Sequence, residues 1–309
     1  MIDITKVKTY SVLKRVSKVR MADFAKLPAR GKSFTNFLSS LPNILKAKDL
    51  RDVVEAIVKA RKKDKAVILM AGAHVIKCGL TPVLIELMRK KVITCISLNG
   101  AGIIHDFEIA LQGKTSEDVA ENLKDGKFGM GKETAEFING AVNEGAAAGL
   151  GLGESVARKI ADSKLAFKSL SLLANAYKFK VPLCVHAAIG TDIIHQHPSF
   201  DAASTGWASG QDFRTLTDEI TRLNNGGVVL NCGSAVILPE VFLKSLNLAR
   251  NLGFTVKDFV TANFDMIHHY RPSQNVVCRP TASGGKGYYI IGHHEIMLPL
   301  LAQAVVEKI

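Results

Sequence analysis

A lysine stands at the start of a short apolar run late in the chain. Ser283-Gly284-Gly285-Lys286 leads directly into Gly287–Ile291, which has the composition of a buried strand. Burial there would lower the pKa of the lysine, and the neutral amine that results can attack an imine or carbonyl carbon. A lysine that reaches from the turn into solvent is the competing interpretation. Lys286 is therefore the candidate catalytic amine, with a solvated side chain as the alternative.

A carboxylate and several imidazoles follow a second predicted strand, at residues 182–186. Asp192 comes first and is followed by His195 and His197. A carboxylate at a strand end can hold a cationic amine through charge-assisted hydrogen bonds. The histidines, with the pairs at 268–269 and 293–294, also permit a metal site, but no acidic residue completes a recognised zinc motif. Metal binding is therefore an alternative hypothesis.

Two glycine-containing turns follow the first two predicted strands. The turn 72–79 contains His74, and its backbone amides are expected to face an anion at the N-terminus of the next helix. The turn 99–106 contains Gly100 and Gly102, which permit close approach of a backbone, and it ends at Asp106. A tight turn with an Asp helix cap is the safer interpretation of the second segment. A third glycine run, 149–153, has no preceding strand, which disfavours a dinucleotide site, and residues 145–148 before it predict a flexible loop.

These turns belong to an alternation of strands and helices. Short apolar runs predict strands at 66–71, 92–98, 182–186, 227–231, 258–263 and 287–291. Helical patterns predict helices at 49–63, 82–90, 154–177, 215–224, 239–252 and 295–306. Strands that alternate with helices of this length predict an α/β fold, with a doubly wound, mostly parallel sheet and helices on both faces. Ligands bind such sheets beyond the carboxyl ends of the strands.

Composition limits the class of protein. The chain has 309 residues, 47% apolar content and no linker-like stretch, which favours one domain over residues 1–309. Its five cysteines are scattered without a CxxC pair, and no signal-peptide pattern or apolar stretch of about 18 residues is present, so a cytoplasmic location is expected. The net charge of +12 suggests an acidic partner, but the 6% of aromatic residues do not interleave with the basic runs. We therefore expect neither nucleic acid nor a membrane as partner.

Several segments together resemble the deoxyhypusine synthase family, in order from about residue 66 to the C-terminus. AHVIKCGL resembles the first cofactor turn of the family, NGAGIIHDFEIAL its Ala-Gly-Gly-Val-Glu-Glu-Asp segment, and GTDIIHQHP the segment with its substrate aspartate. GGVVLNCGSAVILPE and NLARNLG continue the same order, and Ser283-Gly284-Gly285-Lys286 is similar to the family's Ser-Trp-Gly-Lys. The basic N-terminal segment 1–48 lies outside the resemblance. The resemblance implies a deoxyhypusine synthase-like, Rossmann-type fold.

The resemblance also implies an activity. Such enzymes oxidise spermidine with NAD, carry its aminobutyl group as an imine on a lysine, and pass it to a protein lysine of translation factor 5A. Lys286 would be the catalytic lysine. The implied substrate-binding residues are Asp192, Glu240 and Ser283, and the implied cofactor-binding residues are His74, Gly100, Gly102, Asp106 and His294. A homotetramer with active sites shared between subunits is implied as well.

Differences from the family pattern leave other functions open. Ile104 and His105 stand where the family has two glutamates, and Gly284 replaces the tryptophan before Gly-Lys. NAD dependence is therefore expected only if the cofactor site is retained. The alternatives are a homospermidine synthase-like enzyme with a small amine acceptor, a binding protein on the family fold without a redox step, and a metal-assisted enzyme that uses the histidines.

Overall fold

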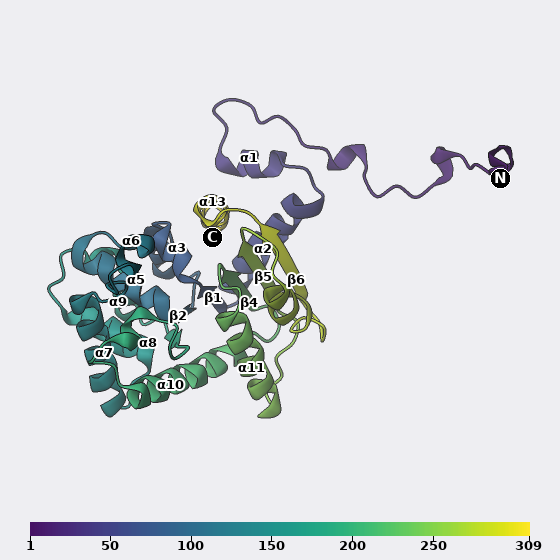
Figure 1. Cartoon of the computed structure of the whole chain (residues 1–309). Coiled ribbons are helices and arrows are strands. Elements are labelled where there is room, and N and C mark those ends of the chain that lie inside the picture. The colour runs from purple at the N-terminus through teal and green to yellow at the C-terminus, as the bar shows by residue number, and fades with distance from the viewer.

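The computed structural model describes residues 1–309 and is built around one parallel sheet (Figure 1). Its strands are β1 (Val67–Ala71), β2 (Cys95–Asn99), β3 (Leu183–His186), β4 (Val228–Cys232), β5 (Val260–Asp265) and β6 (Lys286–Ile291). They lie in the order β3-β2-β1-β4-β5-β6, and every neighbouring pair is parallel. The chain therefore winds outward from β1 to one edge and then from β4 to the other, which confirms the predicted doubly wound α/β class.

Both faces of the sheet are covered, which explains why the strands are apolar along most of their length. In β1, Leu69 belongs to the core beneath helices such as α2 (Leu45–Lys62) and α13 (His294–Val306). Met70 belongs to a second core beneath α10 (Ala202–Thr221) and α11 (Ile237–Asn251). Successive residues of a strand point to opposite faces, so burial on both faces removes the alternation of apolar and polar residues.

The remaining helices precede or connect the strands, and several of them enlarge one side of the molecule. They are α1 (Phe34–Ser40), α3 (Ala73–Lys77), α4 (Thr81–Arg89), α5 (Gly100–Gln112), α6 (Val119–Leu123), α7 (Lys132–Ala147), α8 (Leu152–Asp162), α9 (Leu172–Phe179) and α12 (Tyr270–Pro272). A π-helical turn, Ser273–Cys278, follows α12 before β6. The long connection between β2 and β3 contains α5 to α9 and forms the left part of Figure 1.

Three predicted segments differ from the structure. The helix predicted at 154–177 is two helices, α8 and α9, because the chain turns between them and Ser171 caps α9. The helix predicted at 215–224 begins much earlier, at the N-cap Asp201 of α10. The loop expected before residue 149 is the end of α7, where Gly145 allows α8 to pack closely against it.

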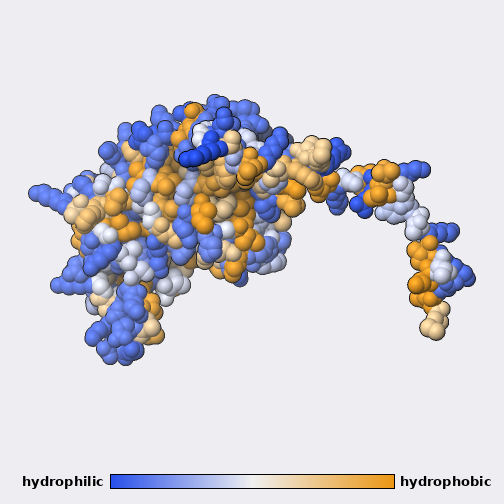
Figure 2. Space-filling view, turned by 90° about the horizontal axis from the view of Figure 1, so that it is seen from above, coloured by the Kyte–Doolittle hydropathy of each residue, from blue (hydrophilic) through white to orange (hydrophobic).

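The first 33 residues form a segment that for the most part extends away from the rest of the chain (Figures 1 and 2) and returns only near its end, where Asp23 and Lys26 bond to the backbone of Asn43 and Ser40. They contain only three short 3-10 turns, and none of their residues is buried. Leu13, Val16 and Leu27 are 92%, 93% and 97% exposed. Figure 2 shows apolar and hydrophilic residues side by side along this segment. Among all helices of the protein, none combines the length and the apolar character that crossing a membrane requires.

Candidate functional site

An acidic pocket lies beyond the carboxyl ends of β2 and β3. The loop after β3 brings Asp192 against Gly100, the first residue of α5, so closely that a Cβ atom on Gly100 would overlap the Asp192 carboxylate. The two residues meet because β2 and β3 are parallel neighbours, whose carboxyl ends lie at the same edge of the sheet. The sequence predicted both as site residues with different ligands, and the structure brings them into contact.

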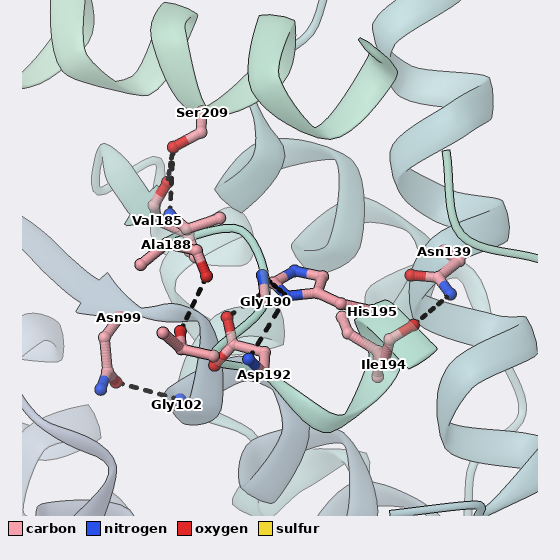
Figure 3. A network of polar contacts seen from close by, with 12 residues as sticks. Asn99, Gly102, Asn139, Val185, Ala188, Gly190, Asp192, Ile194, His195 and Ser209 are labelled. Atoms are coloured by element: carbon pink, nitrogen blue, oxygen red, sulfur yellow. Dashed lines mark hydrogen bonds and ion pairs between the residues drawn. The ribbon is translucent and has the colours of Figure 1, made fainter. Parts of the chain in front are cut away.

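Burial sets the charge state of Asp192. Its side chain is 7% exposed, and burial raises the pKa of the carboxyl to about 6, although a hydrogen bond from the Ala101 amide opposes the shift. His195 Nδ1 accepts hydrogen bonds from the amides of Gly190 at 3.1 Å and Asp192 at 3.3 Å (Figure 3). The neutral ring therefore carries its proton on Nε2, which lies 3.9 Å from Asp192 Oδ2. Burial also lowers the pKa of His195, which keeps the imidazole neutral near pH 7.

The pocket has a volume of about 240 Å³ and collects three carboxylates. Asp192 is joined by Glu108 of α5 and by Glu117 from the segment that follows α5. Glu108 accepts a hydrogen bond from the Thr134 hydroxyl at 3.2 Å, and Glu117 accepts one from the Gly129 amide at 2.9 Å. The rest of the lining includes Lys77, Ile104, His105, Val119, Phe128 and Ile193. A pocket with more carboxylates than basic groups, and with apolar walls, suits a compact organic cation.

Glu108, Glu117 and Lys77 were missed by the sequence analysis. A signal existed for Glu108, because Ala101, His105 and Glu108 recur at helical spacing and therefore share one face of α5. No sequence signal marked Glu117, because it lies in a connecting segment whose path depends on the packing of α5 and α7. Lys77 lies in the same turn as His74 and ends α3, and only the position of α3 beside α5 reveals that it lines the pocket.

A second group of residues lies at the point where the strand order reverses, between β1 and β4. His74 follows β1 and His294 begins α13, and their ring centroids are 6.1 Å apart. A Cβ atom on Gly233, which follows β4, would lie 2.7 Å from His294 Nε2. His294 is 1% exposed, and its Nδ1 atom has no hydrogen-bond partner. Burial lowers the pKa of His294, so its ring is neutral near pH 7.

Doubly wound sheets bind dinucleotides at this switch point. Two features fit such a ligand: His74 is exposed there, and His294 Nδ1 is a buried polar atom that lacks a partner. One feature differs, because β2 ends in Asn99, whereas an acidic residue commonly holds the ribose. Asn99 Oδ1 already accepts a hydrogen bond from the Gly102 amide at 3.2 Å (Figure 3). His74 and His294 are thus the predicted cofactor residues that lie where a dinucleotide would bind.

Two other predicted cofactor residues, Gly102 and Asp106, contribute to packing and helix capping. Gly102 lies in the first turn of α5, where it packs against Leu98. Asp106 is completely buried and accepts hydrogen bonds from the Ser171 hydroxyl and from the Leu172 amide at 2.6 Å. Burial raises its pKa to about 6. The carboxylate therefore caps the N-terminus of α9. Asp106 was expected to contact a cofactor, but the structure places its side chain in the core.

Lys286 lies at the amino ends of the strands, whereas Asp192 lies beyond their carboxyl ends. It is the first residue of β6 and pairs with Val260, the first residue of β5. Its side chain is exposed and lines a surface hollow that also contains Asp52 and Asp258. Within one chain Lys286 is therefore not buried and does not share a pocket with Asp192, because parallel strands place their amino ends together, away from their carboxyl ends; its exposure agrees with the competing interpretation of a solvated lysine.

The residues before Lys286 are explained by backbone packing. Gly284 has a φ of +107°, and a Cβ atom there would overlap the Asp258 side chain. Gly285 has a φ of +93° and lies against the Phe259 carbonyl. A tryptophan, as in the similar family motif, therefore does not fit at position 284. Ser283 accepts a hydrogen bond from the Arg250 guanidinium at 2.9 Å, so it too lies at the amino edge, away from the acidic pocket.

Glu240, the third predicted substrate residue, lies on α11 and outside the acidic pocket. Its carboxylate pairs with Lys244 and with Arg271 at 3.4 Å, and it accepts a hydrogen bond from Asn275 at 2.8 Å. The Lys244 ammonium is the main reason why the pKa of Glu240 lies below its usual value. A carboxylate with these partners has little capacity left for a substrate cation.

The histidines do not form a metal centre. His197 Nδ1 contacts the Ser199 hydroxyl at 2.9 Å, and His269 Nε2 lies 3.8 Å from Asp265 Oδ1. No group of three or more His, Cys, Asp or Glu side chains converges as a metal ion would require. The metal-assisted hypothesis therefore has no ligand set in this chain.

The glycine run 149–153 binds a carboxylate of the chain itself. Asp212 of α10 accepts hydrogen bonds at one oxygen from the amides of Gly153 at 2.8 Å and Val185 at 2.6 Å. A Cβ atom on Gly151 would overlap the other oxygen. Burial raises the pKa of Asp212 to about 7. The run therefore links α8, α10 and the edge strand β3 in an ordered way.

Comparisons with known proteins support the fold only. No family model and no curated protein matches this sequence. A protein from Entamoeba histolytica assigned as a deoxyhypusine synthase has a TM-score of 0.56 and 10% identity, over 92% of this chain and 96% of that one. A protein from Methanococcus maripaludis S2 assigned as an LOR/SDH protein has a TM-score of 0.51 and 14% identity, over 91% of this chain and 72% of that one.

Two longer enzymes are similar over part of their length. AgrE, solved with ornithine and NAD+, has a TM-score of 0.53 and 14% identity, over 84% of this chain. The cyanobacterial arginine dihydrolase ArgZ has a TM-score of 0.53 and 15% identity, over 85% of this chain. This chain spans 33% of the length of each. The neighbours are enzymes on a related α/β fold, and one of them was solved with NAD+.

Proposed function

We propose that the protein is a deoxyhypusine synthase-like transferase that binds spermidine or a related polyamine in the acidic pocket and moves its aminobutyl group to an amine acceptor. The observation that carries the proposal is the buried contact between Asp192 and the N-terminus of α5, in a pocket that also contains Glu108 and Glu117. The fold neighbour assigned as a deoxyhypusine synthase supports the same conclusion at the level of fold.

The electrostatics of the pocket favour a polyamine. With a pKa of about 6, Asp192 is mostly ionised at pH 7, and it has no basic partner that could neutralise it fully, because His195 is neutral. An ammonium group of the ligand would relieve the cost of burying this charge. The methylene segments of a polyamine would contact Ile104 and Phe128.

The proposed reaction passes through a covalent lysine. Bound NAD would supply the hydride acceptor and donor, with His74 and His294 as the residues that would hold it. After removal of a hydride from the aminobutyl carbon that is bonded to the secondary amine of spermidine, a lysine amine attacks that carbon. The C–N bond to lysine forms, the bond to the departing 1,3-diaminopropane breaks, and the proton leaves with the departing amine. The acceptor amine then attacks the same carbon and frees the lysine, and return of the hydride to that carbon would reduce the new imine to a secondary amine.

Two lysines are candidates for the covalent step. Lys77 lines the acidic pocket, whereas Lys286 lies at the amino edge of the sheet. Lys286 can act on a ligand at Asp192 only if a second subunit brings it there, as in the proposed homotetramer with shared sites. The geometry of one chain therefore favours Lys77, and a role for Lys286 requires the oligomer.

The acceptor is either a protein lysine or a small amine such as putrescine, as in homospermidine synthase-like chemistry.

A second function, amine binding without a redox step, is favoured by one observation. The last residue of β2 is Asn99, which accepts a hydrogen bond from its own helix, and not an acidic residue that could hold a ribose. Titration with NAD separates these functions. Only the transferase should form NADH, detected by its absorbance, when the amine is added.

The experiment for the transferase is intact-protein mass spectrometry after incubation with spermidine and NAD and trapping with borohydride. The wild type should gain an adduct of aminobutyl size, and peptide mapping should locate it. An adduct that is lost in Lys77→Ala supports the single-chain site, and one lost in Lys286→Ala supports a site between subunits. The absence of an adduct from folded wild-type protein would exclude the covalent mechanism.

A further inference from the structure

A second cavity lies on the other side of the β3 end from the acidic pocket. It has a volume of about 270 Å³ and opens between α10 and α11. Its lining residues are His186, Ala187, Ile189, Thr205, Gly206, Ser209, Gly210, Phe213, Ile237 and Val241. None of them is acidic or basic apart from the histidine, so the cavity differs in character from the pocket around Asp192. In Figure 3, Ser209 of α10 and Asp192 lie on opposite sides of the loop that follows β3.

A buried imidazole without a partner forms part of this cavity. His186 is the last residue of β3 and is 4% exposed. Its Nε2 atom is buried and has no hydrogen-bond partner in the protein. Burial lowers its pKa to about 4, so the ring is neutral at pH 7 and can either donate or accept a hydrogen bond. Buried polar atoms are nearly always paired, so an unpaired one beside a cavity indicates a missing partner.

Two glycines leave the backbone of α10 bare where it borders the cavity. Gly206 and Gly210 are one turn apart, and a Cβ atom on either would meet no atom within 4 Å. Nothing in the chain therefore requires glycine at these positions, although glycine weakens the middle of a helix relative to alanine. Free space over both turns is what a ligand that packs against the helix backbone would need.

We infer that this cavity binds a small, uncharged and largely apolar molecule, whose one polar group, such as a hydroxyl or an indole N–H, bonds to His186. The apolar walls of Ile189, Phe213 and Val241 would cover the rest of the ligand. A charged ligand is disfavoured, because no lining residue could compensate its charge. This inference does not depend on the proposed transferase activity.

The test uses the full chain and four aromatic probes of similar size. Phenol and indole are the uncharged probes, and benzoate and benzylamine are the charged ones. Saturation-transfer NMR should detect the uncharged probes with affinities in the millimolar range or tighter, at least about tenfold tighter than the charged probes. The imidazole nitrogen signals of His186 should shift when phenol is added, because its nitrogen gains a partner.

Two variants make the test specific. Gly210→Leu should fill the cavity and abolish phenol binding without loss of thermal stability, whereas Asp218→Leu, at an exposed position of the same helix outside the cavity, should bind phenol as the wild type does. His186→Leu should weaken phenol binding by about tenfold, because a hydrogen bond is lost. Equal binding of charged and uncharged probes, unchanged binding in Gly210→Leu, or no binding to the wild type would overturn the inference.

Discussion

Charged residues lie at both ends of the parallel strands, but their surroundings differ. We call the side of the sheet where the strands end its carboxyl edge, and the side where they begin its amino edge. At the carboxyl edge, Asp192 is buried against a helix N-terminus and its pKa is raised to about 6. At the amino edge, Lys286 is exposed beside Asp52, which pairs with Lys48 at 2.7 Å on the protein surface. Ion pairs in solvent contribute little to binding or stability, whereas a buried carboxylate without a fixed cation is available to a ligand. Burial, more than residue type, therefore distinguishes the candidate site from the hollow that contains Lys286.

The largest expected effect is a loss of stability when Asp212, which bonds α10 to α8 and β3, is replaced. Asp212→Ala leaves the amides of Gly153 and Val185 without an acceptor in a buried place, and it should lower the free energy of unfolding by about 2–4 kcal/mol. Chemical denaturation at pH 7 measures this change. A loss below about 0.5 kcal/mol would show that Asp212 does not hold α8, α10 and β3 together.

Asp212→Asn is the matched control, because the amide keeps an acceptor oxygen and does not titrate. The folded-state pKa of Asp212, about 7, lies above the usual value of about 3.9 for an aspartate, so its stabilising contribution is present at pH 4 and is lost as the pH rises through 7. The free energy of unfolding of Asp212→Asn should therefore fall less between pH 4 and 8 than that of the wild type. Parallel pH profiles would contradict this assignment.

Gly100→Ala should damage the amine site without removing a charge. The added methyl group overlaps the Asp192 carboxylate and must displace it from the pocket. Affinity for spermidine, measured by calorimetry, should fall by about tenfold or more, since a charge-assisted hydrogen bond is worth about 1.5–3 kcal/mol. Gly206→Ala on α10, where a Cβ atom meets nothing, is the control and should bind spermidine normally.

The pH dependence of amine binding should follow Asp192. With a pKa of about 6, its ionised fraction falls by about tenfold from pH 7 to pH 5, and spermidine affinity should fall with it. Spermidine itself stays protonated over this range, so the change reports on the protein. Calorimetry at several pH values measures the dependence, and an affinity that is constant between pH 5 and 7 would show that Asp192 does not hold the amine.

The smallest effect is expected at the amino edge. Lys286→Ala removes an exposed side chain, so the free energy of unfolding should change by less than about 0.5 kcal/mol. Asp52→Asn should change the free energy of unfolding equally little, because the asparagine oxygen can still accept the hydrogen bond from the Tyr288 hydroxyl. Denaturation curves of both variants measure this, and a loss above about 1 kcal/mol in either would show that the amino edge is not a simple solvated surface.

The sheet was predictable from sequence, whereas the site was predictable only in part. Apolar runs identified all six strands: β1 to β5 are buried along almost their whole length, and β6 is apolar although only partly buried. The end of a strand identified Asp192. Lys286 was misplaced because its motif is local, and local sequence does not reveal which end of a strand faces the site. Glu117 and Lys77 were missed because their approach to Asp192 depends on how α3, α5 and the segment after α5 pack.

The most direct test of the amine site is a calorimetric titration of spermidine into the wild type, Asp192→Asn and Lys286→Ala. The structure predicts that the wild type and Lys286→Ala bind with similar affinity. Asp192→Asn should bind at least about tenfold more weakly, because the buried negative charge is gone. Undiminished binding by Asp192→Asn, with binding lost in Lys286→Ala, would contradict the assignment of the site to the carboxyl edge.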